Sequence, residues 1–195
     1  MRVTNKGWRD DGRKYWPWEG YGDIVVCGLD QVARSSTDEI TRYSNKLFAE
    51  LGFQIMARIA DSQVHDVVRP LVEKSIEGDE ILCRQLENAL WEARQSGSLL
   101  LPGLIVGFDG KRLRLNDEGP SDNPPLWGWT SDDGLVLLRL CKNQPLENVV
   151  RHELGHLLFG LGHRGHDGSC LMEYDCHERE FCKKCLKEIR ETAIS

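Results

Sequence analysis

The chain has 195 residues, of which 40% are apolar and 29% are charged, and its formal net charge is −6. This length and composition favour one globular domain whose core is large enough to need no disulfide bonds. The negative charge argues against nucleic acid as the main partner, because phosphate binding requires a clustered basic face. No apolar run approaches the ~20 residues that span a membrane. The N-terminus lacks the apolar segment of a signal peptide, so we predict a cytoplasmic protein that does not bind membranes.

The first half of the chain begins with a predicted strand–helix–strand unit. The first strand lies within residues 23–29, and the second lies within residues 53–60. Between them, Ser36-x-x-Glu39 has the form of a capping box that would start a helix, and Gly52 is a typical helix stop. This order of elements predicts a parallel crossover.

The middle of the chain is predicted to contain a helix over residues 79–96, after an ambiguous segment, 66–77, that would form a short helix interrupted near Pro70. Asp-Gly between two strand-like runs is a strong hairpin signal. The predicted strands of this region are 104–108 and 111–115, joined by Asp109-Gly110, and then 126–130 and 135–141.

The residue types that bind metals are concentrated near the C-terminus. Four of the seven cysteines lie between Cys170 and Cys185, and five of the six histidines follow position 151. Disulfides are rare in a reducing compartment, so clustered cysteines indicate a metal site. By contrast, Cys27, Cys83 and Cys141 lie within apolar runs and are interpreted as buried, inert thiols.

A helix that begins near Pro145 carries the principal motif, His152-Glu153-x-x-His156. Proline suits the first helical turn, where its missing N–H would be unpaired anyway. His152 and His156 are four residues apart on one side of the helix, so both imidazoles can reach one ion. Glu153 adjoins the first histidine, where its carboxylate can take a proton from zinc-bound water and pass it to a leaving amine. On its own, the motif also fits a helix with two surface histidines and a salt-bridging glutamate.

Beyond this motif, residues 152–185 resemble the archaemetzincins, which are zinc peptidases of the metzincin clan. The matching motifs, in chain order, are His152-Glu153-x-x-His156, Gly160-x-x-His163, Cys170-x-Met172 and Cys182-x-x-Cys185. The chain departs from the family pattern at two points. Three residues separate His156 from Gly160 where the family has two, and Arg164 stands where the family has a cysteine. One extra helical residue turns the chain by ~100°, so the turn at Gly160 must absorb it if His163 is to reach the metal.

The resemblance implies a role for several residues around the first metal. His163 would be the third zinc ligand, with His166 as the alternative, and Met172 would be the methionine of the Met-turn beneath the three histidines. A further hypothesis lets Tyr174 bind the zinc or stabilise the transition state, although a packed tyrosine with a bonded hydroxyl is the simpler interpretation.

The resemblance also implies a second zinc ion, bound by four cysteines and structural in role. The proposed ligands of this ion are Cys170, Cys176, Cys182 and Cys185. Cys176 would replace the family's missing cysteine, and His166 or His177 could fill that place instead. Free thiols or a redox pair are the alternative to a metal site.

These observations predict one metzincin-like α/β domain over residues 1–195. The part over approximately 1–160 would hold an aromatic, irregular arm (residues 1–22), a twisted mixed sheet with two packed helices, and the active-site helix. The part over 161–195 would hold the Met-turn and the cysteine zinc site. As the resemblance implies, an extended peptide would bind along an antiparallel edge strand, for which 126–130 and 135–141 are the candidates.

The predicted function is that of a zinc-dependent peptidase with Glu153 as general base and a peptide or protein as substrate. The resemblance favours an aminopeptidase or a hydrolase of short peptides. The alternative is a non-catalytic zinc-binding protein that uses a metzincin scaffold to bind a partner. The presence of Glu153 favours the enzyme, because a purely structural zinc site does not need it.

Overall fold

The computed structural model of the chain describes residues 23–53, 55–99, 103–115, 126–131, 134–163, 170–173 and 180–194. These residues form five helices and eight strands. The helices are α1 (Gln31–Leu51), α2 (Ser62–Lys74), α3 (Cys83–Gln95), α4 (Leu146–Phe159) and α5 (Lys183–Ile194). The strands are β1 (Ile24–Gly28), β2 (Ala57–Ile59), β3 (Ile76–Glu77), β4 (Glu80–Leu82), β5 (Gly103–Asp109), β6 (Arg112–Arg114), β7 (Gly128–Thr130) and β8 (Leu135–Leu140).

Five strands form a mixed sheet in the order β2-β1-β5-β8-β7. The first four are parallel to one another, and β7 is antiparallel to β8. The parallel pairing of β1 with β2 across α1 confirms the predicted crossover. Strands β1, β5 and β8 are almost continuously apolar and buried, as parallel strands covered on both faces must be. The three remaining strands form a small sheet in the order β3-β4-β6.

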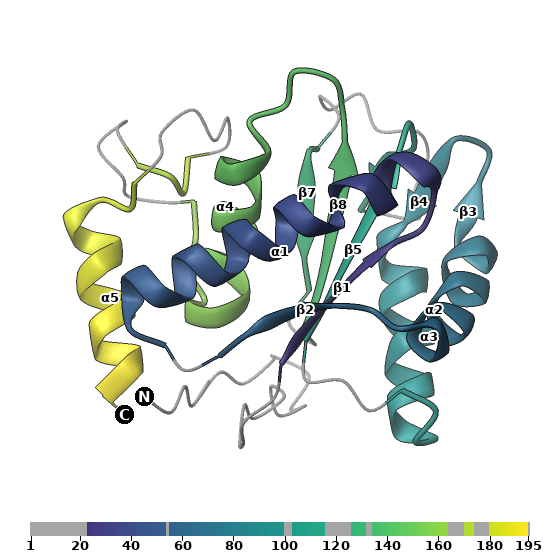
Figure 1. Ribbon diagram of the computed structural model, residues 1–195, viewed down its shortest axis with the longest axis horizontal. Coiled ribbons are helices and arrows are strands. Elements are labelled where there is room, and N and C mark those ends of the chain that lie inside the picture. The colour runs from purple at the N-terminus through teal and green to yellow at the C-terminus, as the bar shows by residue number, and fades with distance from the viewer. Residues whose placement is uncertain are drawn as a thin grey trace.

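Helices cover both faces of the large sheet, with α1 and α4 on one side and α2 and α3 on the other. Ile24 and Val26 belong to the core under α1 and α4, whereas Val25 and Cys27 belong to the core under α2 and α3. This alternation follows from the two-residue period of a strand. Figure 1 shows α4 between the sheet and α5, so the helix with the histidine motif is enclosed on both sides.

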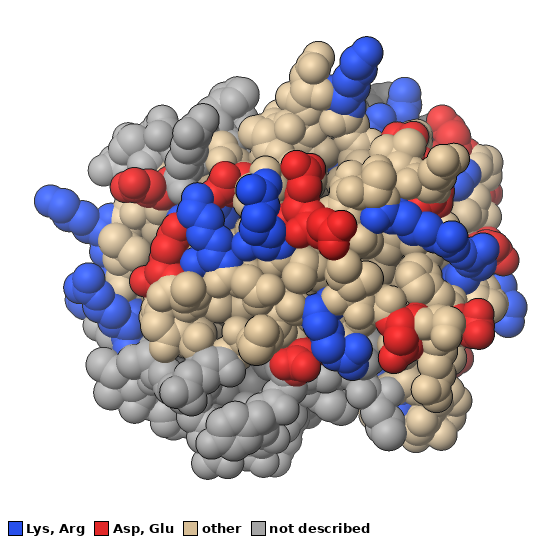
Figure 2. Space-filling view, viewed as in Figure 1, with Lys and Arg blue, Asp and Glu red and all other residues tan. Residues whose placement is uncertain are grey.

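Ion pairs join α4 to α1. The Arg151 Nη1 atom lies 2.8 Å from Glu50 Oε2, and the Lys46 Nζ atom lies 2.7 Å from Glu147 Oε1. Figure 2 shows positive and negative side chains next to one another along this face. Exposed pairs contribute little to stability. Arg151 is different because its side chain is only 10% exposed, and a buried charge requires a partner.

The start of α1 differs from the prediction. The helix begins at Gln31, well before the predicted capping box at Ser36, because Asp30 provides the cap. The Asp30 carboxylate accepts a hydrogen bond from the Ala33 N–H at 2.8 Å and a second from the Asp109 N–H at 2.7 Å. The predicted stop at Gly52 is confirmed, since this glycine has a left-handed φ of 75°.

The predicted hairpin at Asp109-Gly110 is wrong. The strand before the turn, β5, is already paired with β1 and β8, so neither of its edges is open to β6. The strand after the turn, β6, therefore pairs with β4 in the small sheet. That pairing also takes residues 80–82 out of the predicted helix over 79–96, and α3 begins only at Cys83.

The ambiguous segment forms helix α2, which packs on the sheet and begins earlier, at Ser62, than the predicted short helix. Helix α2 runs without interruption through Pro70.

The arm over residues 1–22 lies outside the described residues. Among the helices that the structure describes, none combines the length and the apolar character needed to cross a membrane.

The core under α4 offers a test of the fold. Leu154 is 0% exposed on α4, so Leu154→Ala should lower the free energy of unfolding by about 2–5 kcal/mol, from lost burial and the cavity left behind. Leu115→Ala is the matched control, because Leu115 is 37% exposed and its loss should cost less than about 1 kcal/mol. Urea unfolding followed by circular dichroism measures both. Equal losses would contradict the buried position of α4.

Candidate metal centre and active site

Three histidine side chains converge at the C-terminal end of α4. The Nε2 atoms of His152, His156 and His163 lie 2.9–3.0 Å from one another. Two of these residues come from one face of α4, and the third lies beyond the end of the helix. Nitrogen atoms this close together can all reach one zinc ion at the usual Zn–N distance of about 2.0–2.1 Å.

The other ring nitrogens show why a cation fits this position. His152 Nδ1 donates to the Leu171 carbonyl oxygen at 2.7 Å, and His156 Nδ1 donates to the Leu161 carbonyl oxygen. A carbonyl only accepts, so the Nδ1 atoms carry the protons and the Nε2 lone pairs face one another. Burial and the neighbouring His163 lower the pKa of His156 to about 4, which keeps its ring neutral at physiological pH. Facing lone pairs on neutral rings are the donor set of a metal site.

The end of α4 absorbs the extra residue between His156 and Gly160. Gly160 has a left-handed φ of 62°, and its N–H is directed at the carbonyl oxygens of both His156 and Gly155. The Leu161 N–H also reaches the Gly155 carbonyl, at 3.3 Å. The left-handed glycine ends the α-helix, and the bond from the Leu161 N–H closes the chain back over the last turn, as at other glycine-capped helix ends. His163 therefore lies beside the other two histidines despite the altered spacing.

Met172 packs directly under the histidine-bearing part of α4. It is 0% exposed. A Cβ atom added at Gly155, between the two helix histidines, would lie 2.6 Å from Met172 Sδ. Glycine at this position thus allows the methionine to approach the helix backbone. Met172 is the residue whose Met-turn role the sequence predicted, and it touches α4 without belonging to the histidine group.

The side chain of Glu153 extends from α4 to the edge strand β7. Its side chain is 5% exposed, and burial raises the pKa of its carboxyl to about 7, partly offset by a hydrogen bond from Thr130. The Thr130 Oγ1 atom is 2.6 Å from Glu153 Oε2, and Gly128 packs against the same carboxyl. The sequence pattern indicated this strand but assigned no role to Thr130 or Gly128, because their contact with Glu153 depends on the pairing register of β7.

Three cysteines form a second group. Cys170 Sγ is 3.6 Å from Cys185 Sγ, which is 3.7 Å from Cys182 Sγ. These separations are too long for a disulfide bond. They match the ~3.8 Å edge of a tetrahedron with Zn–S bonds of about 2.3 Å. The N–H groups of Met172 and Cys182 are directed at Cys170 Sγ, where they would stabilise a thiolate.

Burial raises the pKa of Cys170 and of Cys185 above the ordinary thiol value, and the neighbouring thiols raise that of Cys185 further. The thiols of Cys170 and Cys185 therefore favour the protonated form unless a cation compensates the charge of their thiolates. The same donor chemistry fits a zinc ion.

Several predicted site residues lie outside the described residues. They are Cys176, His166, His177 and Tyr174. The fourth ligand of the cysteine group and the part played by Tyr174 thus stay predictions. Among the cysteines interpreted as buried and inert, Cys27 and Cys83 are buried, and burial raises their pKa values to about 11 and about 12. The predicted burial of Cys141 is wrong, because this residue is only partly buried.

The large sheet has one antiparallel edge, and it is β7. The second candidate for that edge, residues 135–141, is wrong because β8 is paired on one side with β5 and on the other with β7. Within the part of the chain that the structure describes, β7 is the end of the sheet next to α4.

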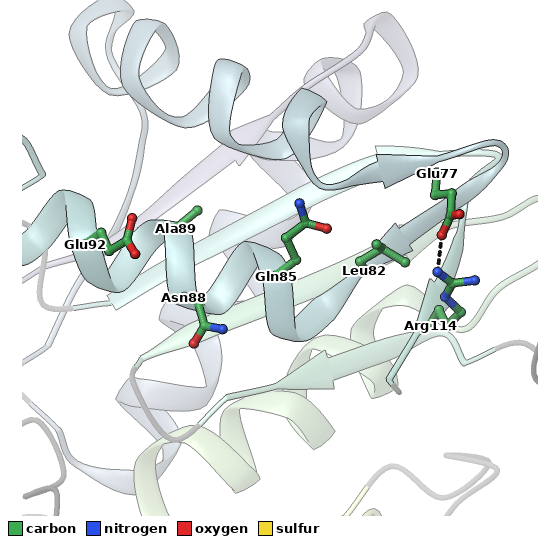
Figure 3. A pocket seen from close by; sticks show the side chains of 7 residues that line it. All are labelled: Glu77, Leu82, Gln85, Asn88, Ala89, Glu92 and Arg114. Atoms are coloured by element: carbon green, nitrogen blue, oxygen red, sulfur yellow. Dashed lines mark hydrogen bonds and ion pairs between the residues drawn. The ribbon is translucent and has the colours of Figure 1, made fainter. Parts of the chain in front are cut away.

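A cleft of about 530 Å³ lies elsewhere in the fold. Figure 3 shows its lining from α3 and the small sheet, with Arg114 paired to Glu77 at one end. Its walls contain no residue from α4, β7 or the histidine and cysteine groups. The cleft is therefore separate from the candidate metal centre.

Comparison with known proteins supports the architecture. A parallel sheet with one antiparallel edge strand over a histidine-bearing helix defines a metzincin-like α/β fold. No model of a known protein family matches the chain, and no curated protein sequence matches it. Among solved structures, the chain is similar to the crystal structure of archaemetzincin from Methanopyrus kandleri. The TM-score is 0.54 at 18% sequence identity, over 92% of this chain and 99% of that one. The chain thus has an archaemetzincin-like fold, as predicted, and its chemistry must be argued from its own residues.

The close packing of Met172 against Gly155 predicts that replacing this helix glycine by alanine lowers the stability of the protein, the reverse of the usual effect. Helix propensity alone predicts that Gly155→Ala stabilises the protein by roughly 1 kcal/mol. The close approach of Met172 predicts the opposite, a loss of about 1–3 kcal/mol from overpacking. Gly162→Ala is the control, since no heavy atom lies within 4 Å of a Cβ added there. Thermal unfolding of both variants decides the sign, and a stabilised Gly155→Ala protein would contradict the packing.

Proposed function

We propose that the chain is a zinc-dependent peptidase that cleaves short peptides or N-terminal residues. The observation that carries this proposal is the juxtaposition of three convergent histidine Nε2 atoms with the buried Glu153 carboxyl, beside an antiparallel sheet edge. A structural zinc site needs the histidines but does not need a buried carboxyl next to them. The archaemetzincin-like fold agrees with this reaction class.

Zinc held by His152, His156 and His163 would polarise the scissile carbonyl and lower the pKa of a water molecule to roughly 7. Glu153 is the residue that would accept the proton of that water at its carboxylate and pass it to the leaving amine. A carboxyl whose pKa lies near 7 suits both transfers, because it gains and loses a proton with little driving force at neutral pH.

The outer edge of β7 is suited to an extended peptide. Trp127 and Ser131 exchange hydrogen bonds with β8, so in an antiparallel ladder Trp129 also faces β8. Gly128 and Thr130 therefore direct their N–H and C=O groups away from the sheet. A peptide that adds to this edge as a strand would lie next to Glu153.

The cysteine group would bind a second zinc ion with a structural role. Three ligands would be Cys170, Cys182 and Cys185, whose sulfur separations fit a tetrahedral site. We propose Cys176 as the fourth, because closed structural sites use four ligands. No nucleic acid partner is proposed.

Replacement of Glu153 tests the reaction. Glu153→Gln keeps the size of the side chain but removes the base, so hydrolysis by the zinc-loaded protein should fall by about 10²–10⁴-fold while its zinc content stays unchanged. Glu39→Gln is the matched control, because Glu39 is exposed on α1. Release of free amines from a peptide library measures the rates. Equal background rates in the wild type and Glu153→Gln would favour the non-catalytic zinc-binding protein instead.

Metal content tests the ligands. We expect two zinc ions per wild-type chain by plasma mass spectrometry, and one in the His163→Ala variant. His166→Ala should retain both ions, because His163 already completes the histidine group. In the cobalt-substituted protein, His163→Ala should keep the sulfur-to-cobalt absorption bands of the cysteine site. Loss of an ion from His166→Ala with none lost from His163→Ala would reverse the assignment.

A further inference from the structure

Thr130 makes two contacts with the same residue of α4. Its Oγ1 atom lies 2.6 Å from Glu153 Oε2 and 3.1 Å from the main-chain oxygen of Glu153. We propose that Thr130 is a positioning residue that holds the Glu153 carboxyl in the orientation required of a general base, and that Gly128 provides the space for it. This proposal rests on the proposed peptidase function and adds to it two residues of the edge strand.

The two residues constrain the two carboxyl oxygens separately. Thr130 binds Oε2, while a Cβ atom added at Gly128 would lie 2.5 Å from Oε1 and 2.7 Å from the carboxyl carbon. Gly128 and Thr130 are two apart in β7, so they are directed to the same face of the sheet. The carboxyl group is therefore held from one strand, by a hydrogen bond on one oxygen and by close packing on the other.

A hydroxyl suits this position because Glu153 must exist in two forms during turnover. Toward the carboxylate, Thr130 donates its proton to Oε2. When Glu153 is protonated at Oε2, the carboxylic acid donates to the Thr130 hydroxyl oxygen. The hydroxyl then donates its own proton to the main-chain oxygen of Glu153. Both forms are thus hydrogen-bonded in a buried place, where an unpaired polar group would be costly.

The position of Thr130 also relates the base to the substrate. The side chain of Thr130 contacts Glu153, while its N–H and C=O groups lie on the edge of β7 that pairs with no other described strand. Strand β7 would therefore hold both the bound peptide and the general base, Glu153, in fixed positions. A displacement of about 1 Å at a reacting group can lower the rate roughly 10²-fold. Fixing Glu153 relative to the peptide should therefore affect kcat more than KM.

The test compares Thr130→Val, which has the same shape without the hydroxyl, with Thr130→Ser, which keeps it. We expect Thr130→Val to lower kcat by about 10–100-fold with little change in KM, and Thr130→Ser to restore most of the rate. Thr37→Val is the matched control. The Thr37 hydroxyl donates to the Arg34 carbonyl within α1 and has no hydrogen bond to α4 or β7 among the described residues, so its removal should leave kcat unchanged.

A binding measurement supplies a second readout that needs no turnover. A peptide hydroxamate contacts both the metal and the general base, whereas a peptide thiol contacts the metal alone. Thr130→Val should weaken the hydroxamate by about tenfold or more and leave the thiol unaffected. Equal weakening of both inhibitors, or of neither, would overturn the positioning role.

The two proposals fail in distinguishable ways. If the wild type cleaves no peptide but Thr130→Val still weakens only the hydroxamate, the peptidase function is contradicted and the positioning of Glu153 is supported. If the wild type cleaves peptides and Thr130→Val has the wild-type kcat, the peptidase function stands and the role of Thr130 is overturned.

Discussion

The hydrogen bond from His152 Nδ1 to the Leu171 carbonyl links the histidine group to the segment that carries Cys170 of the cysteine group. At 2.7 Å, it fixes the tautomer and direction of the first histidine. Leu171 lies between Cys170, a member of the cysteine group, and Met172, which packs against Gly155. Three consecutive residues thus contribute to the cysteine group, the orientation of a histidine and the packing under α4. The cysteine group is in this sense part of the support of the histidine site.

The second constraint is the burial of α4. A helix that is covered on nearly every side is normally apolar throughout, yet this one contains His152, Glu153 and Arg151 with exposures of 3–8%. Each is compensated by a partner on another element: the Leu171 carbonyl, the Thr130 hydroxyl and the Glu50 carboxylate. A buried polar group without such a partner destabilises the fold. The site therefore depends on α1, β7 and the Cys170–Met172 segment together.

Local patterns predicted the elements whose geometry is set within a few residues. The four-residue spacing of His152 and His156 placed both rings on one side of α4, and the apolar runs of β1 and β8 marked buried strands. Contacts between residues far apart in the sequence could not be predicted from such local patterns. The hairpin at Asp109-Gly110 failed because the turn signal says nothing about which edges β5 has already used.

The contact between Thr130 and Glu153 was missed for a related reason, because it depends on the register of β7 against β8 and on the packing of α4 beneath them. The start of α1 was misjudged because two caps were possible within six residues, and the competing Asp30 also binds the end of β5. In both cases a tertiary contact decided between local alternatives.

The glycine-capped end of α4 is where the spacing of the motif differs from the archaemetzincin pattern without loss of the histidine group. Between His152 and His156, a residue inserted into a regular helix would rotate one ring away from the other by ~100°. At the helix terminus, the left-handed Gly160 and the bond from the Leu161 N–H to the Gly155 carbonyl turn the chain, and His163 still lies beside the other two rings. The extra residue at this junction is therefore compatible with a complete histidine group. A search pattern with a fixed interval before the glycine will overlook such chains, whereas one that lets the interval vary by a residue will retain them.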